Sequence, residues 1–153
     1  MTKILLVRFE KKVLHYIISE IDKDLIIIDK NKISFNDSLT DGEKYKKILD
    51  ELLIIKEKYD IEEVLYQGSL KPFRGCIDEV RYGNECILDL FCYQNRIECL
   101  KLNKNIVAKK VGIKLKDVNI LLERKKIEIV DKYKITKSDI LIEILILVLI
   151  IKF

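Results

Sequence analysis

Glycine and proline are scarce in this sequence, which has five glycines and one proline among 153 residues. Flexible linkers and disordered tracts are rich in both, so the composition excludes a chain made mostly of linkers. Hydrophobic residues make up 49% of the sequence, enough for a sizeable core. This length predicts one domain over residues 1–153, which needs no disulfide or metal to hold it together.

Cysteine and histidine offer little to a metal site. The cysteines include no CxxC pair and no secretory leader is visible, so we expect free thiols, no zinc, no cofactor and a cytoplasmic location. The only histidine, His15, is expected to be structural rather than a catalytic base, because no acidic or serine partner for it is visible in the sequence. The cysteines are Cys76, Cys86, Cys92 and Cys99.

Long apolar runs are absent except near the end of the chain, where residues 140–151 are Ile, Leu or Val apart from Glu143. As a helix this run would span about 18 Å, against about 30 Å of bilayer hydrocarbon. We therefore expect no membrane contact and a buried last helix over residues 138–151.

Neither sign of charge dominates. The 29 basic and 25 acidic residues give a net charge of +4, and both signs are mixed along the chain. Global charge therefore does not point to nucleic acid, although a local basic face remains open.

The sequence does have a clear order of secondary-structure patterns. Three apolar runs separated by short charged turns predict an antiparallel meander. Thr40 followed by Glu43 is a capping box, and apolar residues at helical spacing predict a helix from there to Tyr59. The three strands are expected at residues 3–9, 13–20 and 25–29, the last continued by 33–35.

The second half of the chain alternates strands and helices. A strand at residues 63–67 would lie parallel to the first strand after a right-handed crossover. A helix follows at residues 78–93. Its apolar face is expected to present Val80, Gly83, Ile87, Leu90 and Phe91. Further elements are expected as a strand at 96–100, a helix at 104–111, a weakly patterned segment at 114–126 and the last helix.

This order of elements resembles that of the RNase H-like superfamily. A closer resemblance is to a short bacterial RuvC-like family of unknown function and similar size, on residues 3–10, 63–88 and 138–140. The resemblance implies an α/β fold with a mixed five-stranded sheet, three antiparallel strands followed by a parallel βαβ unit, flanked by helices. Actin-like ATPases share this broad architecture, but the sequence has no Gly-rich phosphate loop.

The resemblance also implies where a catalytic site would lie. RuvC-like nucleases place carboxylates at the ends of the first and fourth strands and on the last helix, where they hold two Mg²⁺ ions. The corresponding residues here are Arg8, Gln67 and Asp139, of which only Asp139 is acidic. Because Arg8 would repel the metal ions, we expect a catalytically degenerate protein that binds nucleic acid or a protein partner.

A metal-dependent nuclease or resolvase is the alternative interpretation. Glu10, Glu85 and Asp139 would then hold Mg²⁺ or Mn²⁺, with Glu85 and Asp139 as the catalytic residues. Asp139, however, also forms a capping-box pattern with Thr136. Arg8 is expected to pair with Glu10 or Glu85.

The loop at residues 68–77 is the predicted nucleic-acid surface. It leaves the fourth strand where ligands meet open α/β sheets. Lys71 and Arg74 beside Phe73 suit a phosphate backbone and a stacked base, and Arg81 would extend the same surface.

A structural or interaction protein is the third interpretation. It would be a homodimer formed through the apolar last helix or an exposed strand edge. This interpretation predicts no affinity for DNA or RNA at low salt. The sequence does not distinguish DNA from RNA as a partner.

Overall fold

The computed structural model describes residues 1–68 and 78–153 of the chain. Its centre is a five-stranded mixed sheet in the order β3-β2-β1-β4-β5. β1, β2 and β3 form the predicted antiparallel meander, β4 is parallel to β1, and β5 is parallel to β4. The predicted fold class is therefore confirmed. The strands are β1 (Thr2–Phe9), β2 (Val13–Ile21), β3 (Leu25–Ser34), β4 (Glu63–Gln67) and β5 (Glu98–Leu102).

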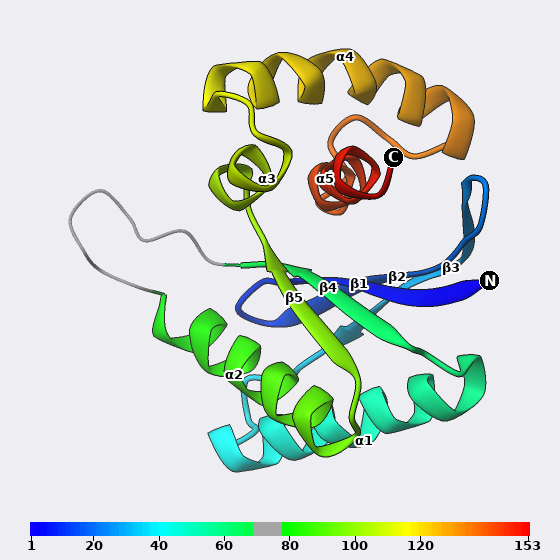
Figure 1. The fold of residues 1–153 in the computed structure, drawn as a ribbon. Coiled ribbons are helices and arrows are strands. Elements are labelled where there is room, and N and C mark those ends of the chain that lie inside the picture. The colour runs from blue at the N-terminus through cyan, green and yellow to red at the C-terminus, as the bar shows by residue number, and fades with distance from the viewer. Residues whose placement is uncertain (69–77) are drawn as a thin grey trace.

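Helices cover both faces of the sheet, with α1 and α2 on one face and α3, α4 and α5 on the other (Figure 1). Successive side chains of a strand point to opposite faces, so β1 contributes to two separate cores. Leu5 and Val7 pack on the α1 and α2 side, whereas Ile4 and Leu6 pack on the α5 side. The helices are α1 (Asp41–Tyr59), α2 (Glu79–Gln94), α3 (Lys104–Val111), α4 (Leu115–Tyr133) and α5 (Ile142–Lys152).

The predicted capping box at the start of α1 is confirmed. The Thr40 hydroxyl accepts a hydrogen bond from the Glu43 N–H at 3.2 Å and donates one to Glu43 Oε1 at 3.0 Å. These bonds satisfy a backbone donor that the helix leaves unpaired at its first turn. The helix ends at Asp60, which has a left-handed backbone with φ of 57°. The start of α1 is thus set by a local signal that the sequence shows.

Four elements differ from their predicted bounds by two residues or more, and one of them is α5, which begins at Ile142 rather than at residue 138. β3 is unbroken, because Lys30 lies opposite Ile17 of β2 and Lys32 lies opposite His15. β5 begins two residues later than predicted. The weakly patterned segment is part of α4, which continues to Tyr133. The continuous β3 matters for the site, because it places two lysines on the sheet.

α5 is the centre of the core above the sheet. Ile144, Leu145, Leu147 and Val148 have no exposed surface, and the helix lies between the sheet and α4 (Figure 1). The prediction of a buried last helix is confirmed. The prediction of a dimer surface on this helix is wrong, because the chain itself covers the helix. Among residues 1–68 and 78–153, no helix has both the length and the apolar content to cross a membrane.

The predicted apolar face of α2 is wrong in part. Of the residues expected on it, Phe91 is buried, but Val80 and Leu90 are 38% and 43% exposed. The face that packs on the sheet includes the polar residues Asn84 and Glu85. α2 therefore buries polar residues against the sheet and leaves apolar residues on its outer side.

Candidate functional site

Arg8 and Gln67 occupy the ends of two parallel neighbouring strands. They are partners in the register of β1 and β4, and Arg8 Nη1 donates a hydrogen bond to Gln67 Oε1 at 3.1 Å. The same nitrogen donates to the backbone oxygen of Ile140, just before α5, at 3.2 Å. The structure thus brings together the end of β1, the end of β4 and the segment before α5, close to the three places that the resemblance implies.

A second arginine reaches the same strand end from α2. Arg81 Nη2 donates to the backbone oxygen of Gln67 at 3.1 Å, and its Nε donates to Glu85 Oε1 at 3.2 Å. Burial lowers the pKa of the Arg8 guanidinium, and the positive charge of Arg81 lowers it further. Two guanidinium groups therefore converge on Gln67, where the resemblance would place a carboxylate.

The expected pairing of Arg8 with Glu10 or Glu85 is wrong, because the hydrogen bonds of Arg8 go to other residues. Glu10 Oε1 lies 2.8 Å from His15 Nε2 on β2. Glu85, only 2% exposed, is held by Arg81 from the same helix, four residues away. The glutamates contact nearer partners, and neutral oxygens of Gln67 and Ile140 receive the Arg8 hydrogen bonds instead.

Asp139 lies before α5 rather than on it. Its Oδ1 accepts a hydrogen bond from the Leu141 N–H at 2.9 Å, and its backbone oxygen accepts one from Ile142. The carboxylate also forms an ion pair with Lys30 of β3. The predicted capping box with Thr136 does not start the helix, because this turn delays the helix to Ile142.

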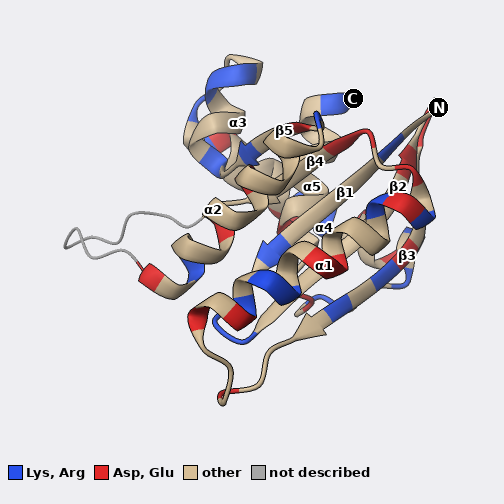
Figure 2. Cartoon of the chain, turned by 90° about the horizontal axis from the view of Figure 1, so that it is seen from below, with Lys and Arg blue, Asp and Glu red and all other residues tan. Residues whose placement is uncertain are grey.

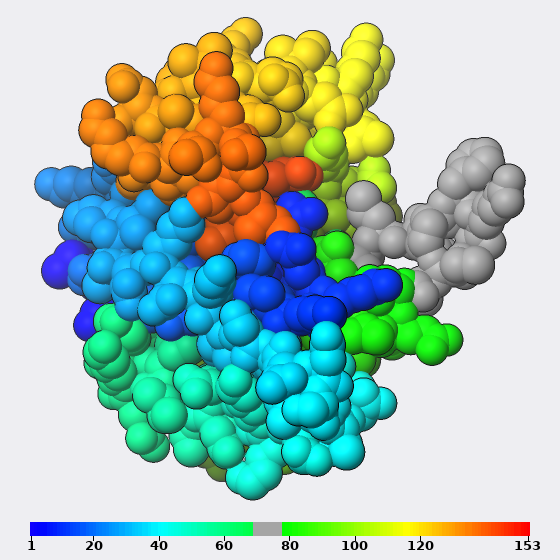
Figure 3. Space-filling model, turned by 180° about the vertical axis from the view of Figure 1, so that it is seen from behind, coloured from blue at the N-terminus to red at the C-terminus, as the bar shows by residue number. Residues whose placement is uncertain are grey.

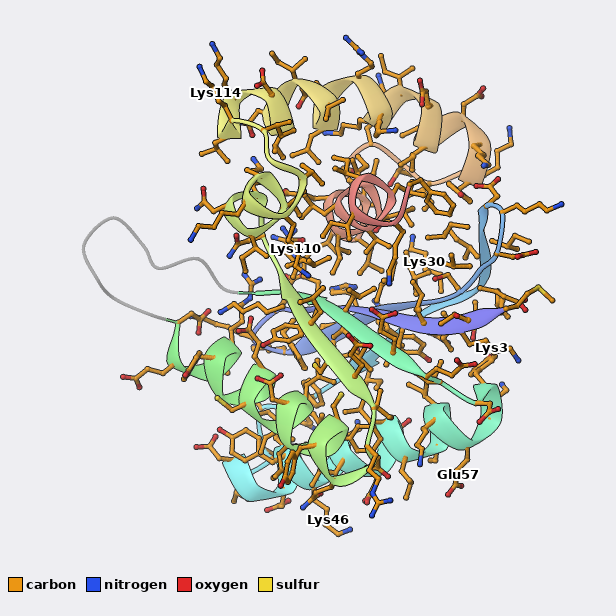
Figure 4. All side chains as sticks on the ribbon, in the orientation of Figure 1. Lys3, Lys30, Lys46, Glu57, Lys110 and Lys114 are labelled. Carbon is orange, nitrogen blue, oxygen red and sulfur yellow. The ribbon has the colours of Figure 1, made fainter. Side chains whose placement is uncertain are left out.

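A row of polar side chains crosses the sheet at this level, on the side that α5 covers. Register pairs place Gln67, Arg8, His15 and Lys32 side by side on four strands, and Lys30 also lies on the α5 side (Figure 4). A hollow of about 460 Å³ opens beside the row. Figure 3 shows this side, where the orange segment before α5 meets the blue strands. The lining residues are Glu10, His15, Lys30, Asn31, Lys32, Ser138, Asp139, Ile140 and Leu141.

The donor set here does not fit a two-metal site. The carboxylates predicted to bind Mg²⁺ or Mn²⁺ contact other side chains. Glu10 contacts a histidine, Glu85 an arginine and Asp139 a lysine. Within the described part of the chain, no group of three or more His, Cys, Asp or Glu side chains is placed to hold a metal ion. Arg8 adds a positive charge where the cations would lie. The arrangement suits an anion better than a cation.

Sequence reasoning missed three members of this site. Lys30 and Lys32 were placed in a break between two short strands, although their alternation with Asn31 fits a strand. The third is His15, whose acidic partner Glu10 lies in the turn between β1 and β2.

The predicted nucleic-acid residues have different outcomes. Lys71, Phe73 and Arg74 lie outside the described residues. Arg81 lies beside Arg8 at the end of β4, but it is not among the residues that line the hollow.

Comparison with known proteins shows the fold. No protein-family model matches the chain, and no curated protein matches it in sequence. A structure of RuvC from Thermus thermophilus has a TM-score of 0.60 at 6% identity, covering 72% of this chain and 69% of that chain. RuvC from the same organism in complex with a Holliday junction substrate has a TM-score of 0.61 at 7% identity, covering 72% of each chain. The chain therefore has an RNase H-like fold of the RuvC type.

Proposed function

We propose that this protein is a RuvC-like module that binds the phosphate backbone of nucleic acid without cutting it. The position of Arg8 carries the proposal. Its guanidinium is oriented by the Gln67 amide oxygen and the Ile140 carbonyl, which are neutral acceptors. Neutral acceptors fix a guanidinium without cancelling its charge, although the negative charges of Glu143 and Glu10 also act on it.

Lys32 supplies an exposed cation at the hollow. It lies two strands from Arg8 in the same row, and within the described residues its Nζ atom has no hydrogen bond or ion pair. A lysine that is not neutralised by the protein is available to a phosphate oxygen. Lys30, by contrast, is paired with Asp139.

The charge at the site supports the part of the proposal that excludes cutting. Hydrolysis by two metal ions needs carboxylates that lower the energy of bound cations. Here Arg8 and Gln67 stand at two of the three positions that the resemblance assigns to carboxylates. The likeness to a RuvC solved with a Holliday junction substrate supports branched DNA as the first ligand to test.

Electrophoretic mobility of labelled single-stranded, duplex and branched DNA and of RNA tests the proposal at low salt, with and without Mn²⁺. The matched variants are Lys32→Gln and Lys46→Gln, which remove one positive charge each. Lys46 is on the outer side of α1, across the sheet from the hollow (Figure 4). We expect Lys32→Gln alone to weaken binding and to reduce the slope of log K against log salt by about one.

Each other outcome counts against a stated part of the proposal. Cleavage that needs Mn²⁺ and disappears in Asp139→Asn would establish the nuclease alternative. Equal losses in the two lysine variants would exclude the hollow as the binding site. No retention of any nucleic acid would favour a protein-interaction role.

A further inference from the structure

A small pocket lies where the β1–β2 turn and the β3–α1 connection meet the first turns of α1 and α2. Its volume is about 230 Å³, and it shares no lining residue with the hollow beside Arg8. It is here called the Lys44 pocket. The lining residues are Lys11, Lys12, Phe35, Asn36, Asp37, Leu39, Lys44 and Val80.

Lys44 is a buried charged residue, with only 9% of its surface exposed. Within the described residues its Nζ atom makes no hydrogen bond, although an ammonium group has three donors. Its one ion pair joins Nζ to Asp41 Oδ1 at 3.8 Å, and the Asp41 side chain is 85% exposed. The Tyr45 ring centroid lies 5.4 Å from Nζ. A buried charge needs a close partner of opposite sign, so Lys44 lacks an anion on the side of the pocket.

The lining of the pocket is positive, because three lysines stand against one aspartate. Asp37 pairs with Lys12 at 2.9 Å, whereas Lys11 has no ion pair in the part of the chain that the structure describes. Acidic and basic residues follow one another at the start of α1 (Figure 2). Counting Asp41 as well still leaves one more positive than negative charge around the pocket.

Apolar side chains surround the lysines. Phe35 is buried, and Leu39 and Val80 complete the wall. Attraction between charges is stronger beside apolar groups than in water. The pocket is smaller than the roughly 300–1,000 Å³ that drug-sized ligands occupy, so it suits one small anionic group.

We infer that the Lys44 pocket binds a dianionic phosphate group. Such a group carries a charge of about −1.5 to −2 at neutral pH and offers at least three acceptor oxygens to ammonium donors. A carboxylate has a single charge and two oxygens, and a phosphodiester also has a single charge, so both match three lysines less well. Inorganic phosphate and the terminal phosphate of a nucleic-acid strand share the required chemistry.

Phosphate binding in this pocket does not require nucleic-acid binding at the hollow. The β1–β2 turn contributes Glu10 to the hollow and Lys11 and Lys12 to the Lys44 pocket. The two places therefore lie on either side of one turn. This arrangement makes the end of a bound strand a source of phosphate to test beside the free ion.

Nuclear magnetic resonance of the isotope-labelled full chain tests the inference, with inorganic phosphate as the probe and ionic strength held constant with chloride. We expect saturable shifts of the amide signals of Lys11, Lys12 and Lys44. Lys44→Met is expected to raise the Kd for phosphate more than about tenfold, because it removes a charged hydrogen-bond donor. The matched control is Lys46→Met, which removes the same charge from the exposed side of α1 and should change the Kd less than about twofold.

Lys11→Gln provides a second variant in case Lys44→Met does not fold. Lys11 is exposed, so circular dichroism should stay unchanged while the Kd for phosphate rises. Shifts that do not saturate would overturn the inference. So would a Kd that both Lys44→Met and Lys11→Gln leave unchanged, whether or not the protein binds nucleic acid at the hollow.

Oligonucleotides with and without a terminal phosphate distinguish the two sources. A preference for the phosphorylated strand that Lys44→Met removes and Lys32→Gln retains would assign the pocket to strand ends. Equal affinity for both strands, together with saturable shifts by inorganic phosphate, would assign it to the free ion.

Discussion

Arg8 donates a hydrogen bond to Gln67 across the parallel pair β1 and β4, at 3.1 Å between Nη1 and Oε1. Both side chains stand at the strand ends where the resemblance to RuvC-like nucleases implies acidic residues. The amide oxygen orients the guanidinium but leaves its positive charge uncancelled. This one contact therefore fixes a guanidinium group at the point where the two strand ends meet.

The contact is expected to stabilise the fold as well as to shape the site. Arg8→Met would leave Gln67 Oε1 and the Ile140 carbonyl without the guanidinium, and we expect a loss of about 1–3 kcal/mol in the free energy of unfolding. Adding Gln67→Leu should cost less than the sum of the two single changes, because neighbours in one hydrogen bond are coupled. Urea unfolding of the four proteins in this cycle measures the coupling, and strict additivity would show that the bond contributes nothing.

The sequence predicted the fold more fully than it predicted the site. Alternation and helical spacing are properties of short segments, so the capping box at Thr40 and the strand 63–67 could be read directly. The site depends on register between distant strands. Lys32 joins Arg8 only because β2 pairs with both β1 and β3, and the sequence contains no local signal for that alignment.

The face of α2 could not be predicted for a related reason. The sequence predicts Leu90 on the buried face because it is apolar, and it does not predict that the charged residue Glu85 is buried. The structure reverses both, since Arg81 compensates Glu85 beneath the helix. The available signal was a possible partner four residues away on the same helix. Such a pair can be either buried or exposed.

Restoring carboxylates at the ends of β1 and β4 should create affinity for metal. Arg8→Asp with Gln67→Glu removes one positive charge and adds two carboxylates at positions that are partners in the sheet. We expect calorimetry to detect Mn²⁺ binding by this variant and much weaker binding by the parent chain. The control is Lys46→Glu with Lys58→Glu on α1. Equal binding by the parent chain would contradict the assignment of Arg8 as a barrier to metal.

The buried ion pair on α2 gives a third prediction. Arg81→Met removes the guanidinium from Glu85, a carboxylate that is only 2% exposed, and we expect a destabilisation of about 3 kcal/mol because a buried charge loses a compensating partner. Arg81→Met with Glu85→Leu should recover part of the loss, since it removes the charge too. Thermal unfolding compares the variants. A double variant less stable than Arg81→Met would show that Glu85 has a separate stabilising role.

Stability should fall at alkaline pH because of a cluster between α2 and β5. The pKa of the Cys99 thiol is raised by its contact with Cys92 and by burial. The pKa of the Tyr66 hydroxyl is raised by burial and by Asp89. Both groups are thus held protonated in the folded state. In the unfolded chain they ionise near their ordinary values of about 8.5 and about 10. The stability that they contribute is therefore complete below about pH 8 and is lost as the pH rises above those values.

Tyr66→Phe isolates the tyrosine part of this effect. The change removes the hydrogen bond to Asp89 and should cost about 1 kcal/mol at neutral pH. It also removes an ionisation that favours unfolding. The difference in the free energy of unfolding between variant and parent should therefore narrow from about pH 9 to about pH 11. Urea midpoints across this range measure the difference, with the exposed Tyr93→Phe as control. A difference that stays constant or widens would show that the Tyr66 hydroxyl ionises at least as easily in the folded protein as in the unfolded chain.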